Sequence, residues 1–512
     1  MQESMDRWSG RRHLRHRRAQ PGDRPDSAQP PGTDRVPAIS HVVILMMENH
    51  SFDNYLGTLG RGDGLADSAP SNLTSTGQKV TPFRLSTTEQ PKGVPSQSWQ
   101  AAHIQYGDGT NDGFVHAVEQ LTPEADPALA MGHWTEEDLP FYAGLGRTFP
   151  LADRWFSSCL GPTFPNRRFL MAGTANGLMD DEIAGVIDYP PNGTVFDLLN
   201  RHGIMWANYH HVPHRRLYGR RIGGMGAMHV GRRGRLLTRH LLPGAARQIR
   251  GEVQCTANLY ALGLFRTLRH LRSIDRFFDD AAAGTLPPVS IVDPDFQSCS
   301  EENPQDIQMG EGFAAAVINA VMHGPGWPGT LLIWLYDEHG GYYDHVPPPP
   351  AVEPDDVLPH GLGERAGVLG WLLRHSVPGH RPSRADAPHG RYDRYGFRVP
   401  AVIISPYAKP DFVSSTVYDH TSVLKLIEEK WNLPFLTCRD AEATAPWEML
   451  DLNGPPAFLR PPDLPSPARP WPVWAPDRRR HQGATRRTRA VRLRRPRPRS
   501  VGPVGCRAPG TD

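Results

Sequence analysis

Two uninterrupted apolar runs in this chain end abruptly in polar residues. His41–Met47 (HVVILMM) is followed by Glu48-Asn49, and Leu331–Leu335 (LLIWL) leads into Asp337-Glu338. An apolar run without alternation is typical of a strand that helices cover on both faces, as in the centre of a parallel sheet. Because ligands bind beyond the carboxyl ends of the strands in open α/β sheets, we expect these two polar clusters to form one site.

The rest of the pattern alternates short strands with helices. Further strands are predicted at Ile204–Tyr209, Val289–Val292 and Val399–Ser405. Helical spacing and capping residues predict helices over Asn111–Leu121, Thr194–Asn200, Phe265–Asp280, Glu311–Met322 and Val423–Trp431. This alternation predicts an α/β fold with a mostly parallel central sheet flanked by helices.

Charge divides the chain of 512 residues into three zones. The net charge is +2, but residues 1–36 carry eight Arg against five acidic residues and residues 461–512 carry thirteen Arg against three, which leaves residues 37–460 at −11. Neither end has enough apolar residues to form a core. We therefore expect disordered basic tails at 1–37 and 461–512 around one folded domain of residues 38–460.

Residues 211–250 form an Arg-rich insertion within that domain, with ten Arg and no acidic residue. A segment of this kind is solvated, or it contacts an anionic surface such as a membrane. Peripheral membrane contact is thus one role for the Arg-rich segments. We expect no specific nucleic-acid partner, because aromatic residues are not interleaved with the arginines of the C-terminal tail.

The remaining composition argues for ordinary buried thiols and against a membrane span. The five cysteines are widely spaced without a CxxC pair, which favours free thiols over a disulfide framework or a zinc site. No run of about 18 apolar residues occurs, so no transmembrane helix is expected. No apolar segment follows Arg11-Arg12 before Ala38, so we expect a cytoplasmic protein, or a secreted or cell-envelope protein if the natural start lies elsewhere.

Thr163 is the candidate reactive group of the sequence. It follows the Gly161-Pro162 turn, and Pro165 suits the first turn of a helix, so its hydroxyl lies near a helix amino terminus that favours an anion. Thr in this setting also serves as a helix cap, and the sequence leaves both interpretations open. Carboxylates and the Asn49 oxygen suit a divalent cation, beside which a hydroxyl can attack phosphorus. Acyl transfer fits less well, because no GxSxG motif is present.

Four longer motifs resemble those of one family. MMENHSFDNYLG, LGPTFPNRRFLMAGT, YDEHGGYYDHVPPP and GFRVPAVIISPYA occur in this order between His41 and Leu436. They are similar to the motif series of the bacterial phosphoesterase family that contains the phosphatidylcholine-type phospholipases C and a group of acid phosphatases. The resemblance implies an alkaline-phosphatase-like fold and a divalent cation as cofactor.

The resemblance also implies roles for single residues. The expected metal ligands are Glu48, Asn49, Asp337 and Glu338, and the expected nucleophile, which forms a phosphoenzyme, is Thr163. Phosphate contact or proton transfer is expected from His103, His420 and His339, and substrate binding from Asn49, Arg167 and His210.

Two positions depart from the family pattern. Gln97 stands where an HSWxxxH motif has its first histidine, and Asn303 lies where the family often has Glu-His-Pro-Pro. These departures leave open which residue protonates the leaving group, with His210, His211 and His339 as alternatives.

The sequence thus predicts a metal-dependent hydrolase of phosphoric esters of the phospholipase C type, with a phosphate ester such as a phospholipid as substrate. The first alternative is an acid phosphatase, which hydrolyses monoesters. The second is a non-catalytic relative that binds phosphorylated ligands. Glu48-Asn49, Thr163 and Asp337-Glu338 occur together, which argues against the second alternative.

Overall fold

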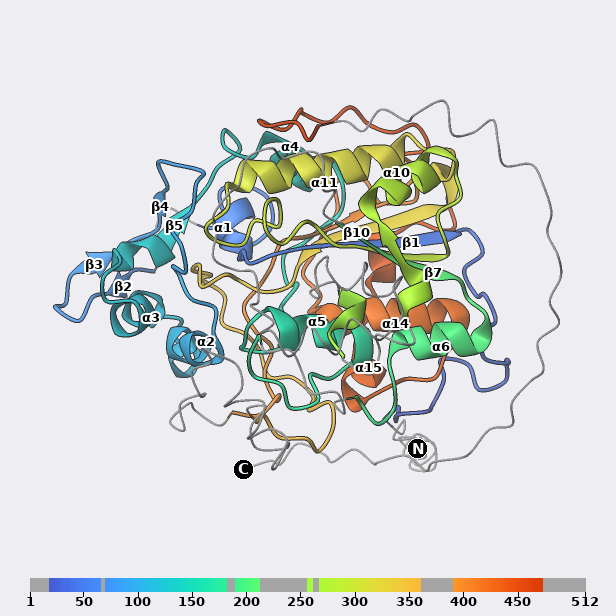
Figure 1. The fold of residues 1–512 in the computed structure, drawn as a ribbon, viewed down its shortest axis with the longest axis horizontal. Helices are drawn as coiled ribbons and strands as arrows, with labels where there is room; N and C mark the ends of the chain where they lie inside the picture. The colour runs from blue at the N-terminus through green and yellow to red at the C-terminus, as the bar shows by residue number, and fades with distance from the viewer. Residues whose placement is uncertain are drawn as a thin grey trace, which may run out of the picture.

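A central sheet organises the computed structural model, which describes residues 18–65, 70–181, 189–211, 256–260, 267–360 and 390–472. The sheet has eight strands in the order β12-β6-β11-β10-β1-β9-β7-β8 (Figure 1). Their bounds are β1 His41–Met47, β6 Leu151–Ala152, β7 Trp206–His210, β8 Leu271–Ser273, β9 Val289–Val292, β10 Thr330–Tyr336, β11 Ala401–Ile404 and β12 Val413–Ser414.

The two apolar runs of the sequence are adjacent parallel strands. β1 pairs with β10 along its whole length, from His41 opposite Thr330 to Met47 opposite Tyr336, and with β9 on its other side. β9, β7 and β8 continue the parallel order. On the far side of β10, however, β11 runs antiparallel to both β10 and β6. The predicted mostly parallel α/β sheet is confirmed, with β11 as the strand that runs against the other seven in this sheet.

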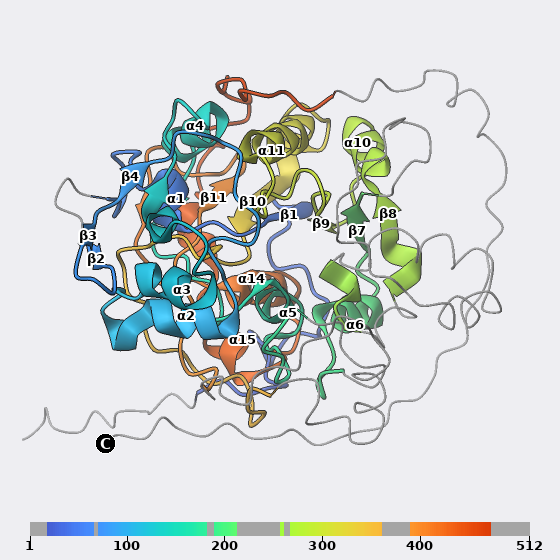
Figure 2. The ribbon, with the colours of Figure 1, turned by 60° about the vertical axis from the view of Figure 1, so that its left-hand side comes forward.

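Helices cover both faces of this sheet. One layer contains α4 Pro140–Thr148, α10 Ile274–Ala282 and α11 Ile307–Met322. The opposite layer contains α5 Thr163–Ala172, α6 Val195–His202, α14 His420–Trp431 and α15 Cys438–Glu442 (Figures 1 and 2). These two helix layers explain why every residue of β10 is buried, because each side chain meets apolar atoms whichever face it points to.

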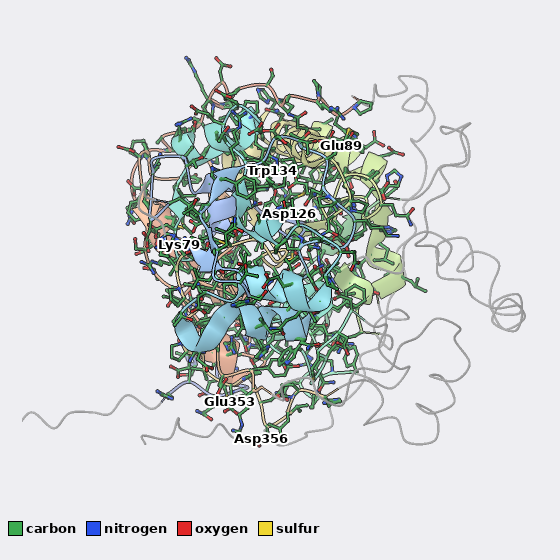
Figure 3. All side chains as sticks on the ribbon, turned by 90° about the vertical axis from the view of Figure 1, so that its left-hand side faces the viewer. Lys79, Glu89, Asp126, Trp134, Glu353 and Asp356 are labelled. Carbon is green, nitrogen blue, oxygen red and sulfur yellow. The ribbon has the colours of Figure 1, made fainter. Side chains whose placement is uncertain are left out.

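A smaller group of elements lies at one side of the sheet. It consists of α1 Phe52–Leu56, α2 Trp99–Tyr106 and α3 Phe114–Leu121 with two short sheets, β2 Asn72–Leu73 with β3 Lys79–Val80 and β4 Phe83–Arg84 with β5 Gly132–His133. Figure 3 looks onto this side, where Lys79 and Asp126 are labelled. Its apolar contacts form a second, smaller core around Phe114 and Phe397.

One predicted helix and the expected state of one cysteine differ from what the structure shows. Leu268–Ser273 is a 3-10 turn and strand β8, and the helix predicted over Phe265–Asp280 begins only at Ile274, where the Ser273 side chain accepts from the Arg276 N–H. The capping hydroxyl, which helical spacing does not reveal, sets this start. Cys159 is a free, buried thiol as expected and Cys299 is also buried, but Cys438 is disulfide-bonded.

The described part of the N-terminal segment is packed against the domain, in contrast to the disorder that we expected. Gly22 N–H donates to Phe435 O, and Asn432 bonds the backbone around Asp26. The Lys430 ammonium, which is almost fully buried, donates to Asp34 (2.7 Å). At the other end, Trp471 packs against Phe313 of α11. Few apolar residues are needed here because backbone and charged groups make the contacts.

Deleting residues 1–36 is therefore expected to lower thermal stability relative to deleting residues 1–17 alone. The longer deletion removes the Asp34 carboxylate and the Val36 carbonyl, which both accept from the buried Lys430 ammonium. A buried charge that has lost its partners is strongly unfavourable. Thermal melting of the two purified deletion proteins measures the difference. Equal melting temperatures would show that these contacts contribute nothing.

Two buried carboxyl groups face each other between α14 and α15. Glu428 lies beside Asp440, which accepts N–H groups from Leu436 and Thr437 (both 2.6 Å). Burial, and then the negative charge of Asp440, raises the pKa of Glu428 well above its ordinary value. The neutral, protonated form of Glu428 is thereby favoured beside the Asp440 carboxylate.

This pair makes folding stability fall as the pH rises. Unfolded Glu428 loses its proton near pH 4.5, whereas the folded protein retains it, so each higher pH unit up to the raised pKa costs about 1.4 kcal/mol. Glu428→Gln is expected to flatten this loss between about pH 5 and pH 8, because the amide cannot ionise. Denaturant unfolding at several pH values is the measurement, with the exposed Glu442→Gln as control. The same slope in Glu428→Gln and parent would refute the assignment.

Candidate active site

The carboxyl ends of four parallel strands bring polar residues to one edge of the sheet. Glu48 follows β1, Asp337 follows β10, Asp293 follows β9, and His210 ends β7. Asp337 N–H donates to Met47 O (3.2 Å), so the strand pairing continues into the site itself. The prediction that the two polar clusters adjoin is confirmed by this register.

Asn49 lies at the centre of the cluster. Its φ of 68° is left-handed, and its N–H donates to Asp337 Oδ1 (3.2 Å). With its amide turned to satisfy its neighbours, the nitrogen lies 2.7 Å from Glu338 Oε1 and 3.2 Å from Thr163 Oγ1. Gly340 permits this proximity, because a Cβ there would lie 1.9 Å from Asn49 O. Asn49 therefore joins the three segments that carry the expected nucleophile and acids.

Thr163 is the first residue of α5 and does not act as its cap. The N-cap is Pro162, without a side-chain capping bond, while the Thr163 hydroxyl lies 3.2 Å from the Asn49 side chain. The Asp181 carboxylate takes the Phe164 N–H (2.7 Å) instead. The sequence left open whether Thr163 caps the helix or is a reactive group. Because its hydroxyl contacts Asn49 and makes no capping bond, it is not the cap. The Asp181 carboxylate shows that this helix end favours an anionic oxygen, as a phosphate site does.

Arg167 is one turn further along α5, and its side chain is fully buried. Nε donates to Asp337 (2.9 Å) and Nη1 to Asp293 (3.1 Å), while the remaining N–H groups meet Thr256 and the carbonyls at the end of β1. All five donors of the guanidinium are thereby used. Arg167 orients Asp337, a role that differs from the substrate contact that we expected.

The site carries more negative charge than Arg167 can balance. Burial, opposed by Arg167 and reinforced by Glu302 and Asp337, raises the pKa of Glu48 well above its ordinary value. Burial and then the charge of Asp337 raise the pKa of Glu338. Glu48 Oε2 is buried without a hydrogen-bond partner among the described residues. An oxygen-rich, underneutralised site with an orphaned carboxylate oxygen fits a divalent cation.

Two of the expected histidines contact the acids of this site. His420, at the start of α14, has its Nε2 2.6 Å from Asp337 O. A carbonyl only accepts, so the proton is on Nε2 and the lone pair on Nδ1, which has no partner in the described part of the chain. His339 lies between Glu338 (Nδ1, 3.3 Å) and Gln105 (Nε2, 2.7 Å). Burial lowers the pKa of His420, and it lowers that of His339 to about 3.

The other two histidines have contacts of a different kind. His103 Nδ1 lies 2.8 Å from the carbonyl of Trp99 in its own helix, and its Nε2 faces Gly390. His210 is buried with Nδ1 3.1 Å from His211 O. Burial lowers the pKa of both imidazoles. Neither set of contacts reaches Thr163, so the catalytic role expected of His103 and the substrate binding expected of His210 stay predictions.

A second acidic cluster, Asp53 with Asp344 and His345, has the spacing of a metal site. The positive charge at this cluster comes from the buried guanidinium of Arg398, which donates to Asp344 (2.8 Å) and to Asp53 (2.9 Å). The guanidinium satisfies these carboxylates in place of a metal ion. The cluster therefore connects the segment before β11, which carries Arg398, to the segment after β10, which carries Asp344 and His345.

Three further residues lie at the site although the sequence did not predict a role for them. Asp293 follows the buried strand β9, just as Glu48 follows β1, so the same signal could have found it. Gln97 places its amide nitrogen 3.1 Å from the Asn49 oxygen and is only half-buried, at the border of the site. Asp181 lacks any local pattern, since it reaches α5 through the tertiary fold.

A helix end with a threonine hydroxyl beside a carboxylate cluster suits phosphoryl transfer. The Phosphoesterase family model matches residues 39–434, and the chain belongs to this family. It is accordingly a hydrolase of phosphoric esters.

Several characterised relatives are phospholipases. Phospholipase C B of Mycobacterium tuberculosis is 30% identical over 429 residues, which cover 77% of this chain and 74% of the relative. Non-specific phospholipase C6 of Arabidopsis thaliana is 28% identical, with 79% and 71% covered. The non-hemolytic phospholipase C of Pseudomonas aeruginosa is 27% identical, with 77% and 54% covered.

Proposed function

We propose that the protein is a metal-dependent phosphodiesterase of the phospholipase C type with Thr163 as its nucleophile. The observation that carries this proposal is the contact of Thr163 with Asn49, beside Asp337-Glu338 and at the amino terminus of α5. The relatives named phospholipase C favour a phospholipid diester over a monoester.

In the proposed reaction the Thr163 oxygen forms a bond to phosphorus while the bond to the leaving alcohol breaks. The positive end of the α5 dipole, at Thr163, favours the negatively charged phosphoryl oxygens. Water then releases phosphate or a phosphomonoester and restores the hydroxyl. Glu48, Asn49 and Asp337-Glu338 would hold the divalent cation, which supplies a lowered hydroxyl pKa and neutralises developing charge.

The free lone pair on His420 Nδ1 makes it the best-placed proton acceptor among the expected histidines. Its Nε2–H is held by Asp337 O, which keeps the ring in one tautomer. Arg167 maintains the orientation of Asp337 on the opposite side of that residue. In this proposal His420 accepts the proton and Arg167 orients Asp337.

An assay with restored metals tests the proposal. The purified chain, stripped of metal, is given one divalent cation at a time with nitrophenyl phosphorylcholine, nitrophenyl phosphate or phosphatidylcholine vesicles. Cation-dependent cleavage of the diester and the vesicles is expected. Preference for the monoester would favour an acid phosphatase. Binding without turnover of any substrate would favour a non-catalytic relative.

A further inference from the structure

A buried carboxyl group that the proposed reaction does not use lies behind the site. Glu301 is fully buried and accepts three tyrosine hydroxyls: Tyr142 on Oε1 (2.6 Å), and Tyr55 (2.8 Å) and Tyr336 (2.5 Å) on Oε2. The tyrosines belong to α4, α1 and β10, three elements that are distant in sequence. Three hydroxyl donors on one buried carboxyl form an anchor that fixes this side chain.

The backbone of Glu301 is held as tightly as its side chain. Its φ of 79° is left-handed, a conformation that is unfavourable for a non-glycine residue unless its surroundings hold it. Its carbonyl accepts from Gln90 Nε2 (2.6 Å) and from His50 Nε2 (3.1 Å). Gly310 of α11 leaves space for the side chain, because a Cβ there would lie 2.1 Å from Glu301 Cγ.

The residues on either side of Glu301 reach the candidate metal ligands. Ser300 O accepts from Glu48 N–H (3.1 Å). The Glu302 carboxylate is close enough to Glu48 and Asp337 for their charges to interact. One hydroxyl of the anchor comes from Tyr336, the residue directly before Asp337.

We propose that Glu301 is a positioning residue that sets the distance between the ends of β1 and β10 and the loop of Ser300 and Glu302. The inference rests on the proposed metal site and deepens it. A tether of this kind preserves the spacing of the oxygen ligands, on which cation affinity depends. Its loss weakens cation binding even while the fold persists.

Calorimetric titration of the metal-free full chain with Mn²⁺, and separately with Ca²⁺, tests the role. Glu301→Gln replaces an acceptor oxygen with a donor that cannot receive a tyrosine hydroxyl. Cation affinity is expected to weaken about tenfold or more, the range for outer-shell changes. Rescue in Glu301→Asp is expected to be partial, because the shorter carboxylate reaches fewer of the hydroxyls.

Tyr209→Phe is the matched control. Its hydroxyl also donates to a buried carboxylate, Asp280 (2.8 Å), but between β7 and α10. The control is expected to lose thermal stability and keep its cation affinity. If Glu301→Gln also loses stability with unchanged affinity, Glu301 is merely structural and the proposal is overturned.

Two further outcomes remain decisive. If Glu301→Gln does not fold, Tyr336→Phe and Tyr55→Phe each remove one hydroxyl from the same anchor, and unchanged affinity in both overturns the proposal. A parent chain that binds neither cation overturns the metal part of the proposed function as well. A parent that binds normally alongside an unaffected Glu301→Gln overturns only the role of Glu301.

Discussion

Thr163→Val is expected to lower the turnover of phosphate esters by about 10³-fold or more while the protein remains folded. Valine keeps the shape of the side chain but removes the oxygen that would attack phosphorus. Because Thr163 makes no capping bond, little stability should be lost. Steady-state turnover and thermal melting of the same preparation give the two readouts.

A genuine threonine cap provides the matched control. Thr437 accepts the N–H groups of Arg439 and Asp440 at the start of α15, so Thr437→Val should cost about 1 kcal/mol of stability without a comparable loss of rate. Thr163→Ser should keep partial activity, since a hydroxyl remains. If Thr163→Val retains more than about a tenth of the parent rate, a metal-activated water is the attacking group instead.

Asp337→Asn is expected to lower bound metal and turnover together. The change removes a charged oxygen from the expected ligand set, so the loss of affinity should exceed the roughly 10- to 100-fold of outer-shell changes. It also removes the charge that faces Arg167 at 2.9 Å, so some stability is lost too. Elemental analysis after dialysis and turnover at saturating cation are the measurements.

Asp293→Asn separates these two effects. Asp293 pairs with the same guanidinium at 3.1 Å but is not an expected ligand. It should therefore reproduce the loss of stability with a smaller loss of metal. Full metal occupancy and normal turnover in Asp337→Asn would remove Asp337 from the metal site.

The sequence by itself determined the central part of the fold. The apolar runs of β1 and β10 predicted two adjacent buried strands, because only residues covered on both faces lack polar alternation. The same signal placed Glu48-Asn49 and Asp337-Glu338 at one edge. The Gly161-Pro162 turn and Pro165 predicted a helix amino terminus near Thr163, where α5 begins, because proline restricts the backbone locally.

Tertiary structure alone decided what those residues contact. Nothing local distinguishes a capping threonine from one that meets Asn49, which is 114 residues away. From the sequence, Arg167 is a cation available for substrate, but in the fold four separate segments take up all its donors. Glu301 requires tyrosines from three elements, and the segment before β1 is held by polar groups of α14. Periodicity reports burial, whereas hydrogen-bond partners across the fold depend on how the elements pack.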